Sequence, residues 1–506
     1  MNGAESLLRT LLAGGVDLCF MNPGTSEMQF VSALDRVPAM RGVLCLHESV
    51  CAGAADGYAR ITGRPAATLL HLGPGLANAL SNFHNARKAR SPIVNIVGEH
   101  STLHLRYDAP LTADVEAFAR PVSGWVHTLD SPARMGAAAA EAIAAARRPP
   151  GQVASLIVPA DHSWSDAGEP APALPVPARN APAAARIAAA SRIIASGQPA
   201  ALLLGGSAAS EAGLAAAART GLPVFLNRYS ALVPRGRPWA SARRVAYFPE
   251  PAEAMLAGLK HLIAVEAEAP VSFFGYPGRR STLAPEDCAV HLLAAQDEDG
   301  IAALQALPAG HAPPKEPALP VLPPDGPLTP ESIGAVLACL LPEGAIVSDE
   351  MVSCGEAVNT ALNLAAPHLL LPVTGGSIGQ GLPVAAGAAL AAPGRKVVAL
   401  EADGSAMYSL QALWTMAREK LDVVTVIFAN RRYRILDVEM RRTGAAIIGP
   451  RADQMIDISR PELDWVRLAA GLGVEASRAA TTAQFQDQFR RALSHPGPRL
   501  IEAALA

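Results

Sequence analysis

Residues 402–433 read ADGSAMYSLQALWTMAREKLDVVTVIFANRRY, and the β-rich run KVVAL, 396–400, lies just before them. The apolar run 423–429 indicates a second buried strand, and the Ala-containing stretch between the two runs indicates a helix. A strand, a Gly turn, a helix and a strand bring Asp403 and Asn430, 27 residues apart, to one edge of a parallel sheet. Open α/β sheets bind ligands at that carboxyl edge. This stretch therefore predicts a parallel α/β fold with a ligand site.

The side chains at this edge suit a metal ion and a diphosphate. Asp403 offers a carboxylate, Asn430 offers an amide oxygen, and a backbone carbonyl just beyond it offers a third oxygen. With diphosphate and water oxygens, these could complete the octahedral shell of Mg2+. Gly404 permits close backbone approach, and the amides of Gly404 and Ser405 open a helix whose positive end favours phosphate. Asp-Gly-Ser alone is also a common turn sequence, so the spacing to Asn430 carries the prediction.

Composition excludes several classes of protein. The chain has 506 residues, half of them hydrophobic, with 17% charged residues and a net charge of -3. Such a chain can bury more than one core and is not disordered. It shows no basic excess that would indicate a nucleic-acid partner. Its six cysteines form no CxxC pair, which favours a reducing cytoplasm.

Two features bear on membranes. The first residues, MNGAESLLRTLLAGG, place an acidic residue before any basic one and lack the layout of a signal peptide. Residues 369–394 carry no charge, but they include six glycines and three prolines. This composition argues against a lipid-exposed helix and indicates a buried loop that leads into a core helix. No membrane association is expected.

Two Pro/Ala-rich tracts, 165–185 and 305–328, read as semi-rigid connectors. They divide the chain into blocks 1–165, 183–304 and 326–506. In each block, short β-rich runs alternate with Ala-rich helical stretches. That alternation is typical of parallel sheets with helices on both faces. We therefore expect an α/β protein with three doubly wound parallel-sheet domains.

The first and third blocks resemble each other at an offset of 331 residues. Without gaps, this offset aligns strand 66–70 with 397–401 and strand 93–98 with 424–429. Two unrelated βαβ units could look equally alike. Alternatively, the chain holds two related domains that face each other across a ligand.

The stretch around Asp403 resembles the diphosphate motif of the thiamine diphosphate-dependent decarboxylase and carboligase family, a Gly-Asp-Gly-Ser turn followed by Asn-Asn. Ala402 and Arg431 depart from that motif. The resemblance implies metal ligands at three positions, the side chains of Asp403 and Asn430 and the carbonyl of Arg432. It implies that the residues binding the cofactor are Glu48, Gly376, Ile378, Asp403, Gly404, Ser405, Asn430, Arg432 and Tyr433. The implied cofactors are thiamine diphosphate and Mg2+.

Glu48 lies in the second motif, LHESVCAGAADGYAR, 46–60. After a strand expected at 43–46, Glu48 could simply be an acidic partner of a helix dipole. However, a Glu followed after eight residues by Gly-Tyr-Ala-Arg is similar to the activating-glutamate signature of the family. The resemblance implies that Glu48 hydrogen-bonds the aminopyrimidine of the cofactor and promotes proton loss from the thiazolium carbon. His47 is expected to be structural.

The loop TGGSIGQGLP, 374–383, resembles the family's segment that bends the cofactor. The resemblance assigns the bulky bending residue to Ile378 and a carbonyl contact with the aminopyrimidine to Gly376. Without that resemblance, Ile378 could equally be an ordinary core residue.

Two further motifs bear on the substrate. The segment NPGTSE, 22–27, resembles a loop of benzoylformate decarboxylase, a member of the family, and places Thr25 where that enzyme has a substrate-contacting serine. His71 then falls on an active-site histidine and is a candidate proton donor, although it could be a hydrogen-bonded core residue. The acetolactate synthase branch is also similar, but Glu99 and Met440 depart from it. The middle block has no GxGxxG sequence, so no FAD is predicted.

The resemblance implies decarboxylation of a 2-oxo acid, with either aldehyde release or carboligation to an acceptor. Acetolactate synthesis is the alternative within enzymes, and an inactive cofactor-binding partner subunit is an alternative of another class. Glu48 and Asp403 lie on different blocks, and the family places them on opposing subunits. We therefore expect a homodimer or homotetramer with active sites between subunits.

Overall fold

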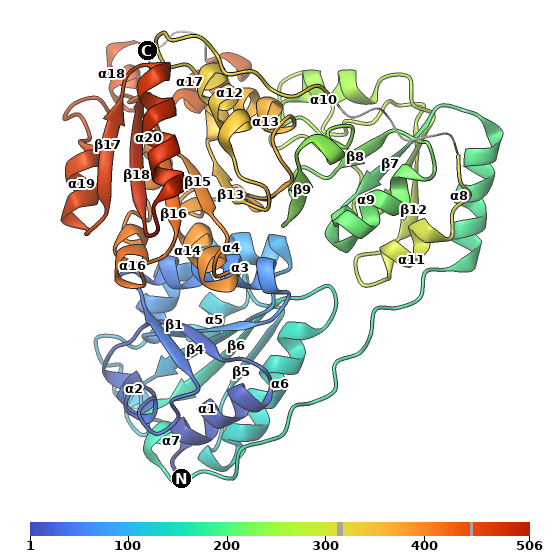
Figure 1. The fold of residues 1–506 in the computed structure, drawn as a ribbon. Coiled ribbons are helices and arrows are strands. Elements are labelled where there is room, and N and C mark those ends of the chain that lie inside the picture. Colours follow the sequence, from blue (N-terminus) through green and yellow to red (C-terminus); the bar gives the residue numbers. More distant parts are fainter. Residues whose placement is uncertain (311–316, 446–448, 506) are drawn as a thin grey trace.

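The computed structural model describes residues 1–310, 317–445 and 449–505. Figure 1 shows three α/β units, each built around its own sheet, with the amino-terminal unit in blue, the central one in green and the carboxyl-terminal one in orange and red. The fold class expected from the sequence is confirmed. The connector predicted at 305–328 lies partly outside the described residues.

The amino-terminal sheet has six parallel strands in the order β2-β1-β3-β4-β6-β5. Its strands are β1 (Leu18–Asn22), β2 (Arg41–Leu44), β3 (Ala66–Leu70), β4 (Ile93–Glu99), β5 (Trp125–Thr128) and β6 (Val153–Pro159). Its helices are α1 (Gly3–Ala13), α2 (Met28–Ala33), α3 (Glu48–Thr62), α4 (Leu72–Ala89), α5 (Val115–Ala119), α6 (Met135–Arg147) and α7 (Ala160–Trp164). The strand expected at 43–46 ends earlier, because the chain leaves the sheet after Cys45 and enters α3.

The central sheet has five parallel strands in the order β10-β8-β7-β11-β12. They are β7 (Ala200–Leu204), β8 (Val224–Leu226), β10 (Arg243–Arg244), β11 (His261–Val265) and β12 (Ala289–Ala294). The helices of this unit are α8 (Ala184–Ser196), α9 (Glu211–Ala218), α10 (Pro249–Leu256) and α11 (Gly300–Gln305).

The carboxyl-terminal sheet has seven strands in the order β17-β18-β16-β15-β13-β14-β9. They are β9 (Val233–Arg235), β13 (Ile346–Glu350), β14 (His368–Pro372), β15 (Val397–Ala402), β16 (Val423–Ala429), β17 (Glu475–Ala479) and β18 (Arg499–Ala504). Its helices are α12 (Pro330–Leu340), α13 (Gly355–Leu362), α14 (Gly381–Ala391), α15 (Asp403–Ala406), α16 (Ala412–Arg418), α17 (Arg434–Arg442), α18 (Pro450–Gln454), α19 (Trp465–Gly471) and α20 (Thr482–Ser494).

Strand β9 departs from the expected all-parallel pattern. It comes from the middle of the chain, yet it pairs antiparallel with β14 at the edge of the carboxyl-terminal sheet. Arg235 of β9 is buried and donates a hydrogen bond to the carbonyl of Ala242. The central unit and the carboxyl-terminal unit are therefore joined by a shared sheet edge.

The first and third units share one strand order. In each, counted from its own first strand and without β9, the order is second, first, third, fourth, sixth, fifth. A single βαβ unit would not fix the positions of the other strands, so the common order favours the interpretation of the chain as carrying two related domains.

The charge-free region 369–394 begins as strand β14 and ends as the buried helix α14. The expected core helix is confirmed, whereas its first residues form a strand rather than a loop. Helix α14 packs closely on α3, since a Cβ at Gly57 would lie 2.2 Å from the carbonyl oxygen of Val384 and one at Gly387 would lie 1.9 Å from that of Ala54. Within the described residues, no helix is long and apolar enough to cross a membrane.

Candidate active site

Glu48 is the first residue of α3 and is largely buried, with 8% of its surface exposed. The Nδ2 of Asn78, on α4, donates a hydrogen bond to Glu48 Oε2 at 3.0 Å. The preceding His47 caps α3, because its Nδ1 accepts the backbone N–H of Ser49. The carboxyl group of Glu48 is thus held by two helices at the edge of the amino-terminal sheet.

A histidine and a carboxylate form a pair at the same edge. Nδ1 of His71, at the end of β3, donates to Glu27 Oε2 at 2.8 Å. Glu27 is 3% exposed and also accepts the N–H of Gly24. The hydrogen bond from His71 to Glu27 raises the pKa of His71 above its usual value. Because Nδ1 is bound to the carboxylate, Nε2 is the ring atom left for proton transfer.

Sequence reasoning identified His71 and Thr25 but missed Glu27. The structure places Thr25 and Glu27 on one short 3-10 helix, Thr25–Glu27, with Thr25 exposed. The carboxylate was visible in the motif NPGTSE. Only the fold shows that it reaches His71, which lies 44 positions further along the chain.

Asp403 and Asn430 meet at one backbone turn of the carboxyl-terminal unit. Asp403 is 3% exposed, and its Oδ2 accepts the N–H of Arg431 at 2.6 Å. Oδ1 of Asn430 accepts the N–H of Arg432 at 3.0 Å. Burial raises the pKa of Asp403, although its hydrogen bonds to backbone N–H groups oppose this effect. The structure therefore places the Asp403 carboxylate and the Asn430 amide on adjacent backbone N–H groups, those of Arg431 and Arg432.

These oxygens suit a hard cation. Among residues 1–310, 317–445 and 449–505, no group of three or more His, Cys, Asp or Glu side chains could hold a metal ion. A Mg2+ here would depend on one carboxylate, the Asn430 amide and the Arg432 carbonyl, completed by diphosphate and water oxygens, which is the usual pattern for this ion. The Arg432 carbonyl also accepts the N–H of Arg434 at 2.8 Å. A carbonyl oxygen has a second lone pair for a metal.

The remaining predicted cofactor residues surround this turn and the loop before α14. Gly404 and Ser405 form the start of α15, and the ring of Tyr433 lies against Gly404, where a Cβ would be 2.5 Å from it. Gly376 has a φ of +79° and lies against the ring of Phe273. Ile378 is half-buried in the same loop.

The candidate residues thus form two groups. Glu27, Glu48, Thr25 and His71 lie at the edge of the amino-terminal sheet, and Asp403 and Asn430 lie at the edge of the carboxyl-terminal sheet. Within the part of the chain that the structure describes, no hydrogen bond or ion pair links the first group to Asp403 or Asn430.

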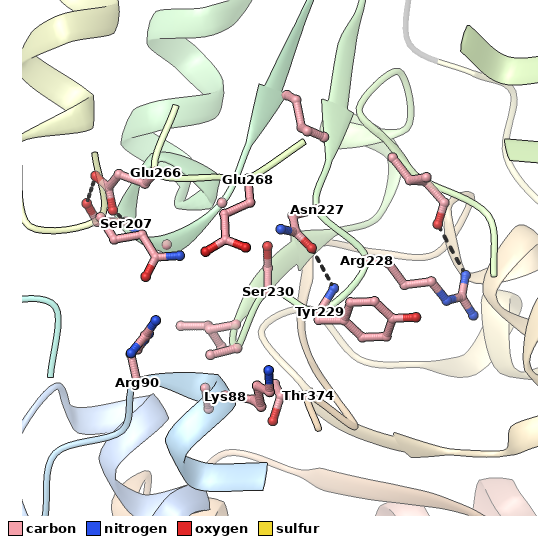
Figure 2. A pocket seen from close by; sticks show the side chains of 18 of the residues that line it. Lys88, Arg90, Ser207, Asn227, Arg228, Tyr229, Ser230, Glu266, Glu268 and Thr374 are labelled. Atoms are coloured by element: carbon pink, nitrogen blue, oxygen red, sulfur yellow. Dashed lines mark hydrogen bonds between the residues drawn. The ribbon is translucent and has the colours of Figure 1, made fainter. Parts of the chain in front are cut away.

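A cavity of about 940 Å³ lies elsewhere, between the central unit, the end of α4 and residues 374–375 (Figure 2). None of the predicted catalytic residues lines it. At its upper left in Figure 2, the carboxylate of Glu266 accepts both the N–H and the hydroxyl of Ser207, in the turn after β7. A bound dinucleotide would place its diphosphate on such a turn. The Ser207 N–H is already bound to Glu266, so in this structure it is not available to a diphosphate.

Comparison with known proteins identifies the family. Residues 1–119 match the N-terminal TPP binding domain of thiamine pyrophosphate enzymes, and residues 354–503 match the C-terminal TPP binding domain. The chain belongs to the thiamine pyrophosphate enzymes.

Individual relatives show which branches of this family are similar. The chain is 50% identical to the Mycobacterium tuberculosis protein "Putative acetolactate synthase large subunit IlvX", over 100% of this chain and 99% of that one. It is 29% identical to benzoylformate decarboxylase of Pseudomonas aeruginosa, over 96% of each chain. A solved structure of the thiamine diphosphate-dependent 4-hydroxybenzoylformate decarboxylase of Rhodococcus jostii RHA1 superposes with a TM-score of 0.87 at 25% identity, over 100% of this chain and 99% of that one. The chain is therefore a thiamine diphosphate-dependent enzyme related to both branches.

Proposed function

We propose that the protein decarboxylates a 2-oxo acid and either releases an aldehyde or joins the product to a carbonyl acceptor. One observation carries the proposal, the His71–Glu27 pair at 2.8 Å on the sheet edge that also holds Glu48. It provides an oriented proton donor beside the activating carboxylate. The relatives named benzoylformate decarboxylase and 4-hydroxybenzoylformate decarboxylase support the same reaction.

Each residue has a proposed role. Bound thiamine diphosphate supplies a nucleophilic carbon and accommodates the electron pair left by carbon dioxide. Glu48, oriented by Asn78, hydrogen-bonds the aminopyrimidine and exchanges a proton with it. His71 Nε2 donates or accepts a proton at the substrate oxygen, and the Thr25 hydroxyl hydrogen-bonds the substrate.

The other proposed roles concern binding of the cofactor. Asp403, Asn430 and the Arg432 carbonyl hold Mg2+. The Ser405 amide faces the diphosphate from α15, and Gly404, whose N–H donates to Asp403 Oδ1, permits close approach of the backbone to it. Gly376 and Ile378 contact the cofactor from the loop before α14, and Tyr433 contacts it from the turn after β16.

Acetolactate synthesis is the second candidate, and the 50% identical relative supports it. Glu99 and Met440 are the two positions at which this sequence departs from the acetolactate synthase branch. Glu99 is buried at the end of β4, where burial raises its pKa, and Met440 lies on α17. An inactive partner subunit is the third candidate, and the Glu48–Asn78 hydrogen bond at 3.0 Å argues against it.

A substrate panel tests the proposal. Purified protein with Mg2+ and thiamine diphosphate is given pyruvate, benzoylformate and other 2-oxo acids, and carbon dioxide and products are measured. We expect carbon dioxide from at least one acid. Free aldehyde supports the decarboxylase, acetolactate from pyruvate supports the synthase, and cofactor binding without turnover of any acid supports the inactive subunit.

Glu27→Gln is expected to change the pH dependence of the reaction. The raised pKa of His71 keeps the ring protonated to a higher pH than usual. If His71 acts as an acid, kcat/KM falls as pH rises through that pKa. The neutral amide no longer stabilises the protonated His71 ring, so the alkaline limb of kcat/KM should shift to a pH about one unit lower.

The pH profile has a matched control in Glu116→Gln, which removes a carboxylate of the same unit that binds Thr128 and Arg120. This control should leave the limb in place. An unmoved limb in Glu27→Gln would show that the ionisation of His71 does not govern the reaction.

We further propose a homodimer or homotetramer in the cytoplasm. Several large apolar side chains are exposed in the loop after β4 and near α15 and α18, and a second copy would cover them; they are Leu103, Tyr107, Tyr408 and Met455. An active site shared between two copies would also account for the separation of the Glu48 and Asp403 groups within one chain. Sedimentation of the purified protein should show a dimer or a larger closed assembly, and a monomer would contradict this proposal. All six cysteines are free, in keeping with a reducing compartment.

A further inference from the structure

The turn between Ile378 and helix α14 is held by a buried carboxylate that no motif had indicated. Glu350 is the last residue of β13 and is 1% exposed. Its Oε1 accepts the N–H of Gly379 at 2.5 Å, and its Oε2 accepts the N–H of Gly381. One carboxylate therefore binds the two amides on either side of Gln380.

Other side chains complete the same turn. Asn82 donates to the carbonyl of Gly379 at 3.1 Å, and Ser348 donates to that of Gly381 at 2.9 Å. Gln380 donates to the buried Asp56 at 2.8 Å. Among the residues that the structure describes, Glu350 alone contributes a carboxylate to the backbone of this turn, and its hydrogen bonds are charge-assisted when it is ionised.

The backbone conformation of the turn suits a glycine. Gly379 has a φ of +89°, in the left-handed region where L side chains are rarely found. Burial raises the pKa of Glu350 to about 7, whereas the backbone N–H groups of residues 379–381 lower it. A buried carboxylate is tolerated only where hydrogen bonds compensate for lost hydration. Carboxylate and turn therefore depend on each other.

We propose that Glu350 is a positioning residue that fixes the Gly379–Gly381 turn and thereby sets the position of Ile378 against the cofactor. This inference rests on the proposed function, in which Ile378 contacts the cofactor. Ile378 directly precedes Gly379, so a shift of the turn moves its side chain. Glu350 itself lies beneath the turn, at the end of β13, and has no proposed contact with substrate or cofactor.

A double-mutant cycle tests whether Glu350 acts through Ile378. Glu350→Gln keeps the shape of the side chain but presents an amide group to one of the two N–H donors. The rate of hydrogen–deuterium exchange at the thiazolium carbon of bound cofactor, read by NMR after acid quench, should fall about tenfold in Glu350→Gln and in Ile378→Ala. In the double variant it should fall no more than about twofold below Ile378→Ala.

Each outcome has one meaning for the inference. Exchange in Glu350→Gln within about twofold of the unmodified protein overturns it, and so do effects that multiply in the double variant. If the unmodified protein shows no exchange at all, the proposed function fails together with the inference. If Ile378→Ala slows the exchange but the Glu350 variants exchange as fast as the unmodified protein, the inference fails and the proposed function stands.

Two further variants separate positioning from general stability. Glu502→Gln removes another carboxylate of the same sheet, on β18 and 1% exposed, and should leave the exchange rate unchanged. Glu350→Asp keeps the charge but shortens the reach, so it should lose part of the exchange rate even if Glu350→Gln does not fold. Full exchange in a folded Glu350→Asp protein would overturn the inference.

Discussion

Glu48→Gln is expected to abolish hydrogen–deuterium exchange at the thiazolium carbon of bound thiamine diphosphate while cofactor affinity stays within about tenfold of the unmodified protein. Gln retains an oxygen that can accept the hydrogen bond from Asn78, which is 3.0 Å from Glu48 Oε2. It cannot take up or release a proton near neutral pH, and positioned acid–base groups contribute about 10²- to 10⁴-fold in rate. The change should therefore affect proton transfer much more than binding.

Two measurements on the same sample check this prediction. NMR after acid quench gives the exchange rate, and titration with thiamine diphosphate at fixed Mg2+ gives the dissociation constant. Ser49→Ala is the matched control, because Ser49 is the next residue and its hydroxyl contacts only His47 among the described side chains. Unchanged exchange in Glu48→Gln would remove Glu48 from the proposed mechanism.

The sequence predicted those parts of the site that depend on local order along the chain. Asp403 and Asn430 each directly follow a strand of one strand–helix–strand unit, so their spacing alone predicts that they share a sheet edge. The structure adds the contact, a hydrogen bond of 2.6 Å from the Arg431 N–H to Asp403.

Parts that depend on tertiary contacts were not predictable. Glu27 reaches His71, on a different strand end, and Glu350 reaches a turn 29 to 31 residues further along the chain. Nothing in the sequence around Glu350 distinguishes it from any acidic residue at the end of a strand. Strand β9 is a similar case, because three residues of the middle block pair with the edge of another sheet.

Asp403→Ala is expected to weaken Mg2+-dependent binding of thiamine diphosphate by about 100-fold or more. The substitution removes the only carboxylate proposed as a metal ligand. It also removes the acceptor of two backbone N–H groups, those of Arg431 at 2.6 Å and Gly404 at 2.8 Å. Asp403→Asn separates the two effects, because an amide oxygen can still accept from Arg431 while the charge is lost. We expect Asp403→Asn to keep most of the thermal stability and still lose at least about tenfold in affinity.

Calorimetric titration with thiamine diphosphate at several Mg2+ concentrations measures this loss. Asp422→Asn is the control, since Asp422 precedes β16 at the opposite edge of the sheet and pairs with Lys396. Its cofactor affinity should not change. Glu48→Gln should then lose exchange and keep cofactor affinity, whereas Asp403→Ala should lose cofactor affinity. Tight, Mg2+-dependent binding by Asp403→Ala would contradict this prediction, because it would mean that the metal and the diphosphate do not depend on the Asp403 carboxylate.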